Sequence, residues 1–137
     1  MEAEIVMHTG GCHCKSVRWK VAAPSSVVVW DCNCSICYMR GNANFTVPAD
    51  KFKLLGDSAE FLTTYTFGTH TAKHTFCKIC GITSFYYPRS NPDGVAVTIR
   101  CVDHGTLRIY EVKNFDGKNW ERSYNESGIA SCSKVQK

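Results

Sequence analysis

Hydrophobic and polar positions alternate with a period of two along much of this chain. Apolar Val17, Trp19 and Val21 alternate with basic residues, which is the pattern of a strand with one buried face. Short runs rich in β-branched and aromatic residues predict further strands at residues 26–30, 44–47, 52–55, 60–67, 73–76, 84–87, 95–102 and 107–112. Many short strands separated by turns predict a mainly β fold.

Turns that contain glycine and proline separate these runs, and the segment at residues 90–94 is the clearest of them. Residues 120–124 predict one helical turn, after which the chain becomes polar and loses its apolar period. We therefore expect a single domain over residues 1–124 and a polar, frayed tail at residues 125–137. A chain of 137 residues has room for one domain, which agrees with this division.

Composition narrows the functional classes. Hydrophobic residues make up 44% of the chain and charged residues 20%, as in an ordinary globular protein. The net charge of +4 is spread without a basic run, so nucleic-acid binding is not expected. No stretch approaches the roughly 20 apolar residues that span a bilayer, and the acidic start lacks the pattern of a secretory signal. We therefore expect no membrane association and a location in the cytoplasm or nucleus.

Nine cysteines are the strongest chemical signal in the sequence. In a reducing compartment, closely spaced cysteines are more often metal ligands than disulfides, and an odd number excludes complete intrachain pairing. Cys101 and Cys132 stand alone, and we expect the first to be a buried small hydrophobic residue and the second to be free. The others fall in three clusters, which are Cys12 and Cys14; Cys32, Cys34 and Cys37; and Cys77 and Cys80.

The third cluster is the most specific by itself. Cys77 and Cys80 precede Gly81 with the spacing of a zinc knuckle, in which glycine permits the left-handed backbone of the turn. A CxxC pair can also be a redox site, but such sites accompany a βαβ pattern that this sequence lacks. Zinc binding is therefore the favoured interpretation.

The number of clustered cysteines suggests how the three clusters would divide between two zinc ions. A structural zinc takes four protein ligands, whereas a catalytic zinc takes three and keeps one position open. The first and third clusters together supply four sulfurs, and Cys32, Cys34 and Cys37 supply three. Spacing alone permits other sets of four, and a histidine could close the three-cysteine site. Three thiolates leave Zn²⁺ with a net charge of −1, which makes the ion a better Lewis acid than four thiolates would.

These clusters and the residues around them resemble the glutathione-dependent formaldehyde-activating enzyme family, which includes the globular domain of centromere protein V. Residues 88–92 resemble the centromere protein V branch in particular. The resemblance spans roughly residues 8–124 and rests on residues 10–14, 31–37, 64–67, 74–81 and 84–86.

The resemblance implies a β-tent of twisted antiparallel sheets, with a structural zinc at Cys12, Cys14, Cys77 and Cys80 and a catalytic zinc at Cys32, Cys34 and Cys37. It also implies condensation of formaldehyde with glutathione into S-(hydroxymethyl)glutathione, the reverse of a carbon–sulfur lyase reaction. The expected partners are therefore these two small molecules, with the oligomeric state open. Two alternatives remain, which are a zinc-stabilised binding module of centromere protein V type without catalysis and a reductase or thiol carrier that uses the loop cysteines.

The chain departs from the family pattern at three positions. Asn33 and Tyr38 stand where bacterial members often have histidine and a basic residue, and Arg40 could take over the role of the basic residue. If those positions bind an anionic thiol, its affinity would change. Lys15 replaces a small residue, and we expect it on a tolerant strand surface. Arg89, like Arg40, is expected on the solvated surface unless it binds a glutathione carboxylate.

For the remaining candidates, a structural role is the default interpretation. We expect His74 to be a core or edge residue, with a proton donor or a fourth zinc ligand as the alternative. His13 and His104 are expected at the surface. The tryptophans at positions 19 and 30 and the aromatic run at residues 85–87 are expected in the core rather than at a ligand.

Overall fold

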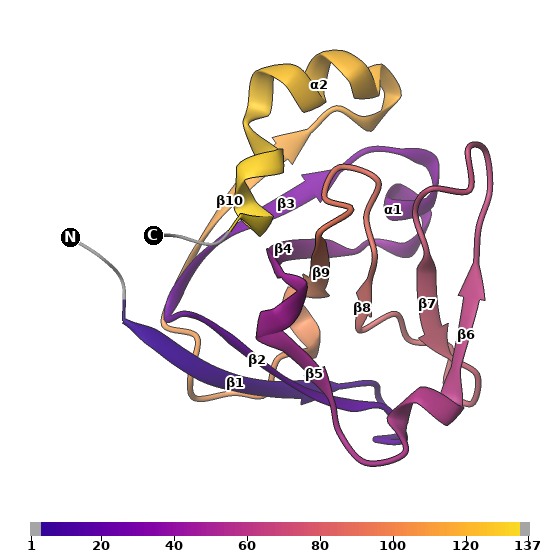
Figure 1. The fold of residues 1–137 in the computed structure, drawn as a ribbon, viewed down its shortest axis with the longest axis vertical. Helices are drawn as coiled ribbons and strands as arrows, with labels where there is room; N and C mark the ends of the chain where they lie inside the picture. The colour runs from indigo at the N-terminus through magenta and orange to yellow at the C-terminus, as the bar shows by residue number, and fades with distance from the viewer. Residues whose placement is uncertain (1–3, 135–137) are drawn as a thin grey trace.

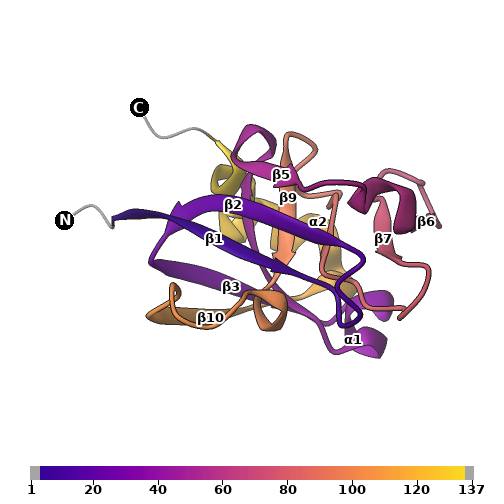
Figure 2. The ribbon, with the colours of Figure 1, turned by 90° about the horizontal axis from the view of Figure 1, so that it is seen from below.

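A computed structural model describes residues 4–134 and shows a mainly β protein, which confirms the predicted fold class. The strands of this part of the chain form three sheets. The first sheet is antiparallel and has the order β1-β2-β5, with β1 at Ile5–Gly11, β2 at Arg18–Pro24 and β5 at Phe52–Leu54. β1 and β2 form a long hairpin across the lower part of Figure 1, and Figure 2 shows this hairpin from below.

The second sheet carries the site described below. One of its pairs, β10 (Ile109–Phe115) with β3 (Ser26–Cys32), is parallel, so it is an exception to the antiparallel arrangement. Because a hairpin cannot join parallel neighbours, this pairing brings distant parts of the chain together and sets Cys32 opposite Phe115. The third sheet is the hairpin of β6 (Leu62–Tyr65) and β7 (His74–Cys77). The second sheet has the order β10-β3-β4-β9-β8, with β10 at Ile109–Phe115, β3 at Ser26–Cys32, β4 at Ala43–Pro48, β9 at Gly94–Thr98 and β8 at Phe85–Tyr86.

The main core lies between the first and second sheets. Trp19 and Val21 on β2 are fully buried, so the alternation read from the sequence does mark an inward face. Phe52 bridges the two sheets, since its ring centroid lies 5.6 Å from that of Trp19 and 4.6 Å from that of Phe85. The indole N–H of Trp19 donates to Ser84 Oγ at 3.0 Å, which satisfies its polar group in the interior.

The first strand, β1, is missing from the strands predicted by sequence because its buried face is not apolar. His8 and Gly10 point inward, whereas Ile5 and Met7 on the other face are 65% and 51% exposed. A Cβ atom at Gly10 would lie 2.3 Å from the carbonyl oxygen of Cys101, so only glycine fits this close approach. A period-two pattern of apolar residues therefore identifies the wrong face here.

Other segments also differ from their predicted conformation. The three-cysteine loop contains a short helix, α1 (Ser35–Arg40), which ends at Gly41 with a left-handed φ of +68°. The predicted strand at residues 95–102 stops at Thr98 and continues as the 3₁₀ turn η3 (Ile99–Cys101). No helix within residues 4–134 is long and apolar enough to cross a membrane. Further 3₁₀ turns are η1 (Ala49–Lys51), η2 (Ser58–Phe61) and η4 (Gly117–Asn119).

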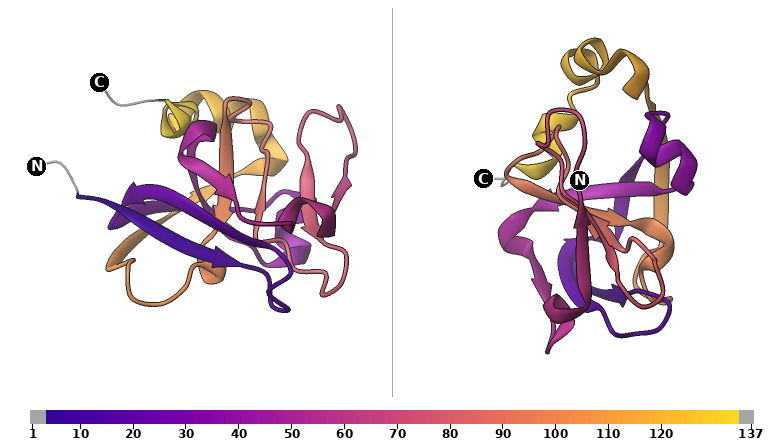
Figure 3. Two further views of the ribbon diagram at one scale, coloured as in Figure 1. Left: turned by 60° about the horizontal axis from the view of Figure 1, so that its bottom comes forward. Right: turned by 90° about the vertical axis from the view of Figure 1, so that its right-hand side faces the viewer.

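The segment after β10 is folded rather than frayed, which corrects the sequence prediction for residues 125–134. It forms α2 (Trp120–Ser127) and the 3₁₀ turn η5 (Ile129–Ser133), so the predicted boundary after residue 124 falls inside a helix. Residues 135–137 of the predicted tail lie outside the described residues. Figures 1 and 3 show α2 at the end of the molecule opposite the β1–β2 hairpin. Ile129 anchors the segment by packing against two aromatic side chains of the second sheet.

Asn91 ties this C-terminal segment to the sheet. It is 1% exposed, and its side-chain amide donates to the Ile129 carbonyl oxygen and to Ser133 Oγ, both at 2.9 Å. Replacing Asn91 with alanine is expected to lower the free energy of unfolding by about 2 kcal/mol, because buried acceptors lose their donor. Chemical denaturation measures this loss, and exposed Asn125→Ala serves as the matched control. An unchanged unfolding midpoint for the Asn91 variant would contradict the prediction.

Candidate metal centres and the adjoining pocket

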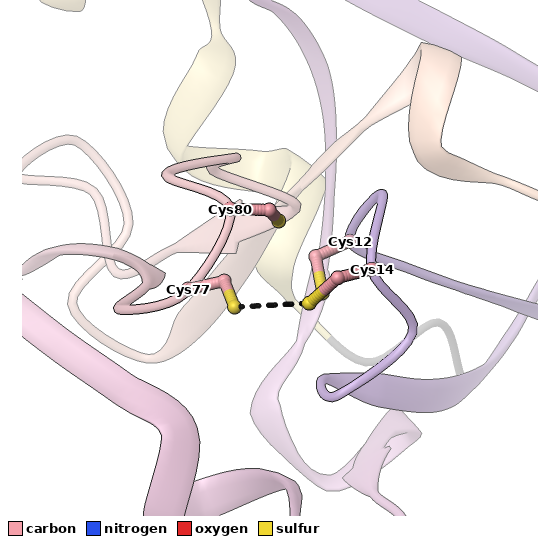
Figure 4. A group of neighbouring side chains, drawn as sticks. All are labelled: Cys12, Cys14, Cys77 and Cys80. Atoms are coloured by element: carbon pink, nitrogen blue, oxygen red, sulfur yellow. Dashed lines mark hydrogen bonds between the residues drawn. The ribbon is translucent and has the colours of Figure 1, made fainter.

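Four sulfurs from two distant parts of the chain converge at one point. Cys12 and Cys14 lie in the turn between β1 and β2, while Cys77 ends β7 and Cys80 lies in the turn that follows. Figure 4 shows the two pairs facing each other, and all four Sγ atoms lie within 4.8 Å of one another. Cys14 Sγ is 3.7 Å from Cys12 Sγ and 3.6 Å from Cys77 Sγ. A tetrahedral ion with sulfur at about 2.3 Å separates its ligands by about 3.8 Å, so the group has the geometry of a closed metal site.

The backbone of both turns supports this geometry. The Val17 N–H donates to Cys12 Sγ at 3.3 Å, which stabilises a thiolate there. Gly81 has a φ of +77° and closes the knuckle turn as its spacing predicts. Lys15 also has a left-handed φ, of +69°, so it lies in the first turn and not on the strand surface where we expected it. Glycine is favoured at such a backbone position, so Lys15 adopts it at some conformational cost.

Cys12 and Cys14 have opposite pKa shifts without a cation. Burial raises the pKa of Cys12 to about 11, whereas the Ser16 hydroxyl, 3.3 Å from Cys14 Sγ, lowers the pKa of Cys14 to about 6. A divalent cation between the sulfurs would favour the thiolate at all four positions. Four thiolates are a donor set that Zn²⁺ takes in closed sites, so the residues fit this ion.

Cys32, Cys34 and Cys37 form a second group where β3 ends and α1 begins. Their Sγ atoms lie within 4.8 Å of one another, and the Cys34 N–H donates to Cys32 Sγ at 3.4 Å. Among residues 4–134, no histidine or carboxylate joins this group, and His74 is therefore not brought in as a fourth ligand. The described residues thus offer three sulfurs to an ion and leave room for one more ligand.

The pKa shifts of the three thiols in the second group also favour a bound cation. Contact with the other two thiols lowers the pKa of Cys34 to about 2, and contact with Cys34 raises the pKa of Cys32 to about 11. The same kind of contact, with burial, raises the pKa of Cys37. The contacts therefore favour a thiolate at Cys34 and disfavour one at Cys32 and Cys37, and a positive ion between the sulfurs would favour the thiolate at all three positions.

The backbone of η4 covers the three-cysteine group. A Cβ atom at Gly117 would lie 2.5 Å from Cys34 Cβ, so this glycine is required by close approach. Asn33 holds the covering backbone in place, since its amide donates to Asp116 Oδ1 at 3.0 Å and its oxygen accepts from the Lys118 N–H at 3.3 Å. Asn33 thus positions the loop and does not line the adjoining pocket.

Replacing Gly117 with alanine is expected to weaken metal binding at the three-cysteine group by about ten- to a hundredfold. The added methyl would also lie 2.8 Å from Cys32 Sγ, which forces the sulfurs apart. Titration with a graded chelator, followed by measurement of the metal-to-protein ratio, tests this directly. The four-cysteine centre is the internal control because Gly117 does not approach it. Equal loss of metal from both centres would contradict the prediction.

A pocket of about 510 Å³ adjoins the three-cysteine group. This volume lies within the range of about 300–1,000 Å³ that is usual for small-molecule sites. Buried Cys37 and His74 lie at its base, whereas half-buried Arg89 and exposed Lys118 lie at its rim. No aspartate or glutamate of the described chain lines it. The pocket therefore favours a small ligand that carries negative charge.

Two stacked rings form one wall beside the sulfurs. Tyr86 and His74 have ring centroids 5.0 Å apart, and the Tyr86 hydroxyl lies 3.9 Å from Cys37 Sγ. Burial raises the pKa of Tyr86, so the phenol keeps its proton and can donate a hydrogen bond. Burial lowers the pKa of His74, so its ring is neutral at physiological pH. The structure therefore places His74 in the core, as expected, but against the pocket.

The two arginines predicted as alternatives occupy different places. Arg89 lines the pocket with its guanidinium 3.7 Å from the centroid of the Trp120 ring, and Nη2 lies 3.5 Å from Glu121 Oε1. Stacking holds the guanidinium at the rim and leaves donors for a carboxylate. Arg40 instead packs over the Phe76 ring at 5.9 Å and lines a separate hollow. Arg89 is thus the arginine that lines the pocket, whereas Arg40 lies on α1, close enough to Cys37 for their charges to interact, and lines the separate hollow.

The other predicted positions are placed as follows. His13 and His104 are exposed, as expected, and Tyr38 is 77% exposed on α1. Cys101 is half-buried in η3, at the point where the predicted strand has already ended. Cys132 is also half-buried, since it packs with the C-terminal segment instead of lying in a frayed tail.

Sequence analysis missed the parts of the site that come from far along the chain. The aromatic run that includes Tyr86 predicts a core position, and no pattern in the sequence marks Gly117 or Lys118 as part of a site. The turn sequence at residues 116–119 was visible, but its contact with the cysteine loop depends on the parallel β3–β10 pairing. No local signal in the sequence reports such a contact.

Together, the fold and the two cysteine groups define a class of protein. Its members are mainly β proteins with a closed group of four sulfurs and a second group of three sulfurs that lies beside a pocket. A family model described as glutathione-dependent formaldehyde-activating enzyme matches residues 7–116. The chain is also similar to a Rhodobacter sphaeroides protein of known crystal structure, at 32% identity and a TM-score of 0.64, over 74% of this chain and 98% of that one. This chain therefore belongs to the glutathione-dependent formaldehyde-activating enzyme family.

Membership confirms the family resemblance and indicates a formaldehyde-activating function that involves glutathione. The particular similarity to the centromere protein V branch stays a prediction. So does the location in the cytoplasm or nucleus.

Proposed function

We propose that this protein is a zinc-dependent carbon–sulfur lyase that interconverts S-(hydroxymethyl)glutathione with glutathione and formaldehyde. The observation that supports the proposal most is the position of the three-cysteine group. Its sulfurs lie beside a pocket, and no fourth ligand comes from the described residues. A three-ligand site of this kind is typical of catalytic rather than structural zinc.

The two centres would hold zinc in different roles. The closed group at the β1–β2 turn and the knuckle would bind a structural ion that ties β1, β2 and β7 together. The group of Cys32, Cys34 and Cys37 would hold the second ion. When bound there, Zn²⁺ supplies Lewis acidity and lowers the pKa of a thiol that approaches it.

The residues around the pocket would orient glutathione and its adduct. Arg89 and Lys118 at the rim would bind the carboxylates of glutathione, so that its cysteine side chain reaches the base of the pocket. There the glutathione sulfur attacks the formaldehyde carbon, a carbon–sulfur bond forms, and the carbonyl oxygen takes a proton. Tyr86, whose hydroxyl lies 3.9 Å from Cys37 Sγ, would donate a hydrogen bond to that developing oxygen.

The rate of adduct formation tests this proposal. Protein with a measured metal content is added to glutathione and formaldehyde, and exchange between free and adduct forms is followed by nuclear magnetic resonance. Because the uncatalysed reaction is already fast, the expected result is a rate that rises in proportion to protein concentration. A rate equal to that of buffer, in protein that holds two metal ions per chain, would refute the proposal and favour the binding module.

A further inference from the structure

Part of the pocket wall is apolar, but S-(hydroxymethyl)glutathione carries no apolar group that would fill the space beside it. Trp30, Phe115 and Ile129 line the pocket and are 6%, 4% and 6% exposed. They pack against one another and against Cys32, so they lie next to the three-cysteine group. The hydroxymethyl group adds a single carbon and a hydroxyl to the thiol. Walls of this kind instead stabilise a larger apolar substituent.

Charge and burial divide the pocket into two parts. The cationic lining residues are half-buried Arg89 and exposed Lys118, which match the carboxylates of a tripeptide thiol. Trp30, Phe115 and Ile129 are buried beside Cys32. With the polar tripeptide at the rim, the apolar base is left for whatever group is attached to the glutathione sulfur.

One side of this base comes from the C-terminal segment, beyond the residues 7–116 that the family model matches. Trp120 on α2 and Ile129 on η5 both line the pocket. The wall is firmly held, because Asn91 bonds the Ile129 carbonyl, and Lys134 Nζ pairs with Asp93 Oδ2 at 2.6 Å. A segment that the family match does not include therefore shapes the space beside the three-cysteine group.

We propose that this protein accepts aldehydes with an apolar or aromatic substituent, which it binds as their hemithioacetals with glutathione. Trp120 and Ile129 are the specificity-determining residues for that substituent. This inference rests on the proposed function. In the reaction, the thiol sulfur bonds to the aldehyde carbon, the carbon–oxygen π bond breaks, and the thiol proton ends on the new hydroxyl. The balance needs no oxidant or reductant.

Binding of two unreactive thioethers, S-methylglutathione and S-benzylglutathione, tests the inference by calorimetry. The benzyl compound is expected to bind about tenfold more tightly or better, because its ring leaves water for the apolar wall. Ile129→Phe, which fills the space, and Trp120→Ala, which removes part of the wall, are expected to bring the ratio of the two affinities toward one. Exposed Asn125→Ala is the matched control in the same segment and should keep the wild-type ratio.

Equal affinity of wild-type protein for the two thioethers would overturn the inference, as would an unchanged ratio in the wall variants. Trp120 is only half-buried, so its alanine variant carries the test if the Ile129 variant fails to fold. Formaldehyde adduct formation is measured on the same samples. Turnover without a benzyl preference would refute this inference alone, whereas absence of both turnover and thioether binding would refute the proposed function as well.

Discussion

Cys77→Ser is expected to unfold this protein at room temperature. Cys77 is 1% exposed, and its sulfur lies 3.6 Å from that of Cys14, a residue 63 positions earlier in the chain. Structural zinc contributes roughly 10–16 kcal/mol in small zinc peptides, which matches or exceeds the about 5–15 kcal/mol that keeps a typical domain folded. The hydroxyl of serine is a poor zinc ligand, so the centre would lose its closed set of thiolates. Circular dichroism and metal content of the purified variant measure the effect.

The matched control for this variant is Cys101→Ser. It makes the same chemical change at a half-buried cysteine that belongs to neither metal-binding group. We expect it to cost about 1–2 kcal/mol, because a buried thiol is replaced by a more polar hydroxyl without loss of an ion. If the two variants were equally stable and held equal amounts of zinc, the four-cysteine group would not be a structural centre.

Cys37→Ser is expected to leave the protein folded while it removes the second metal ion and the catalysed reaction. All three cysteines of this group fall within residues 32–37, so an ion there closes only a short local loop. Closing a short loop adds little to stability, unlike a link between distant strands. The catalysed rate should fall by more than the about ten- to hundredfold typical of changes outside the ligand shell. The measurements are the metal-to-protein ratio, expected to fall from two to one, and the excess rate over buffer.

Comparison of the two cysteine variants separates the roles of the two centres. Thermal unfolding of the Cys37 variant should resemble that of wild-type protein, whereas the Cys77 variant should show no cooperative transition. Similar destabilisation by both substitutions would contradict separate structural and catalytic roles. Normal turnover by a Cys37 variant that holds one zinc would place the reaction elsewhere in the molecule.

The cysteine clusters show how far sequence reasoning extends in this protein. Each pair or triplet is close in sequence, so the local turn brings its sulfurs together whatever the rest of the fold does. Gly81 in the knuckle has the left-handed backbone that its position after Cys80 predicts. The pairing of the first cluster with the third was one of several sets that spacing allowed, and the family resemblance selected the set that the structure brings together.

The C-terminal segment shows where that reasoning stops. Residues 125–134 are mostly polar, and their order depends on one buried isoleucine and on hydrogen bonds from Asn91, about forty positions earlier. The first strand was missed for a related reason, since its buried face carries His8 and Gly10 and not a run of apolar residues. In both segments, specific partners elsewhere in the chain decide the conformation, and composition does not reveal them.

The sequence by itself determined the cysteine clusters that could hold metal ions, the alternating strands of the core and the family, because these depend on residue type and short spacing. Only the tertiary structure decided which arginine lines the pocket, which glycine covers the three cysteines and which segment forms the apolar wall. The physical reason is the parallel pairing of β3 with β10, which places Asn33 against Asp116, 83 positions later. Contacts over such separations arise from the packing of whole sheets, and no local pattern of residues records them.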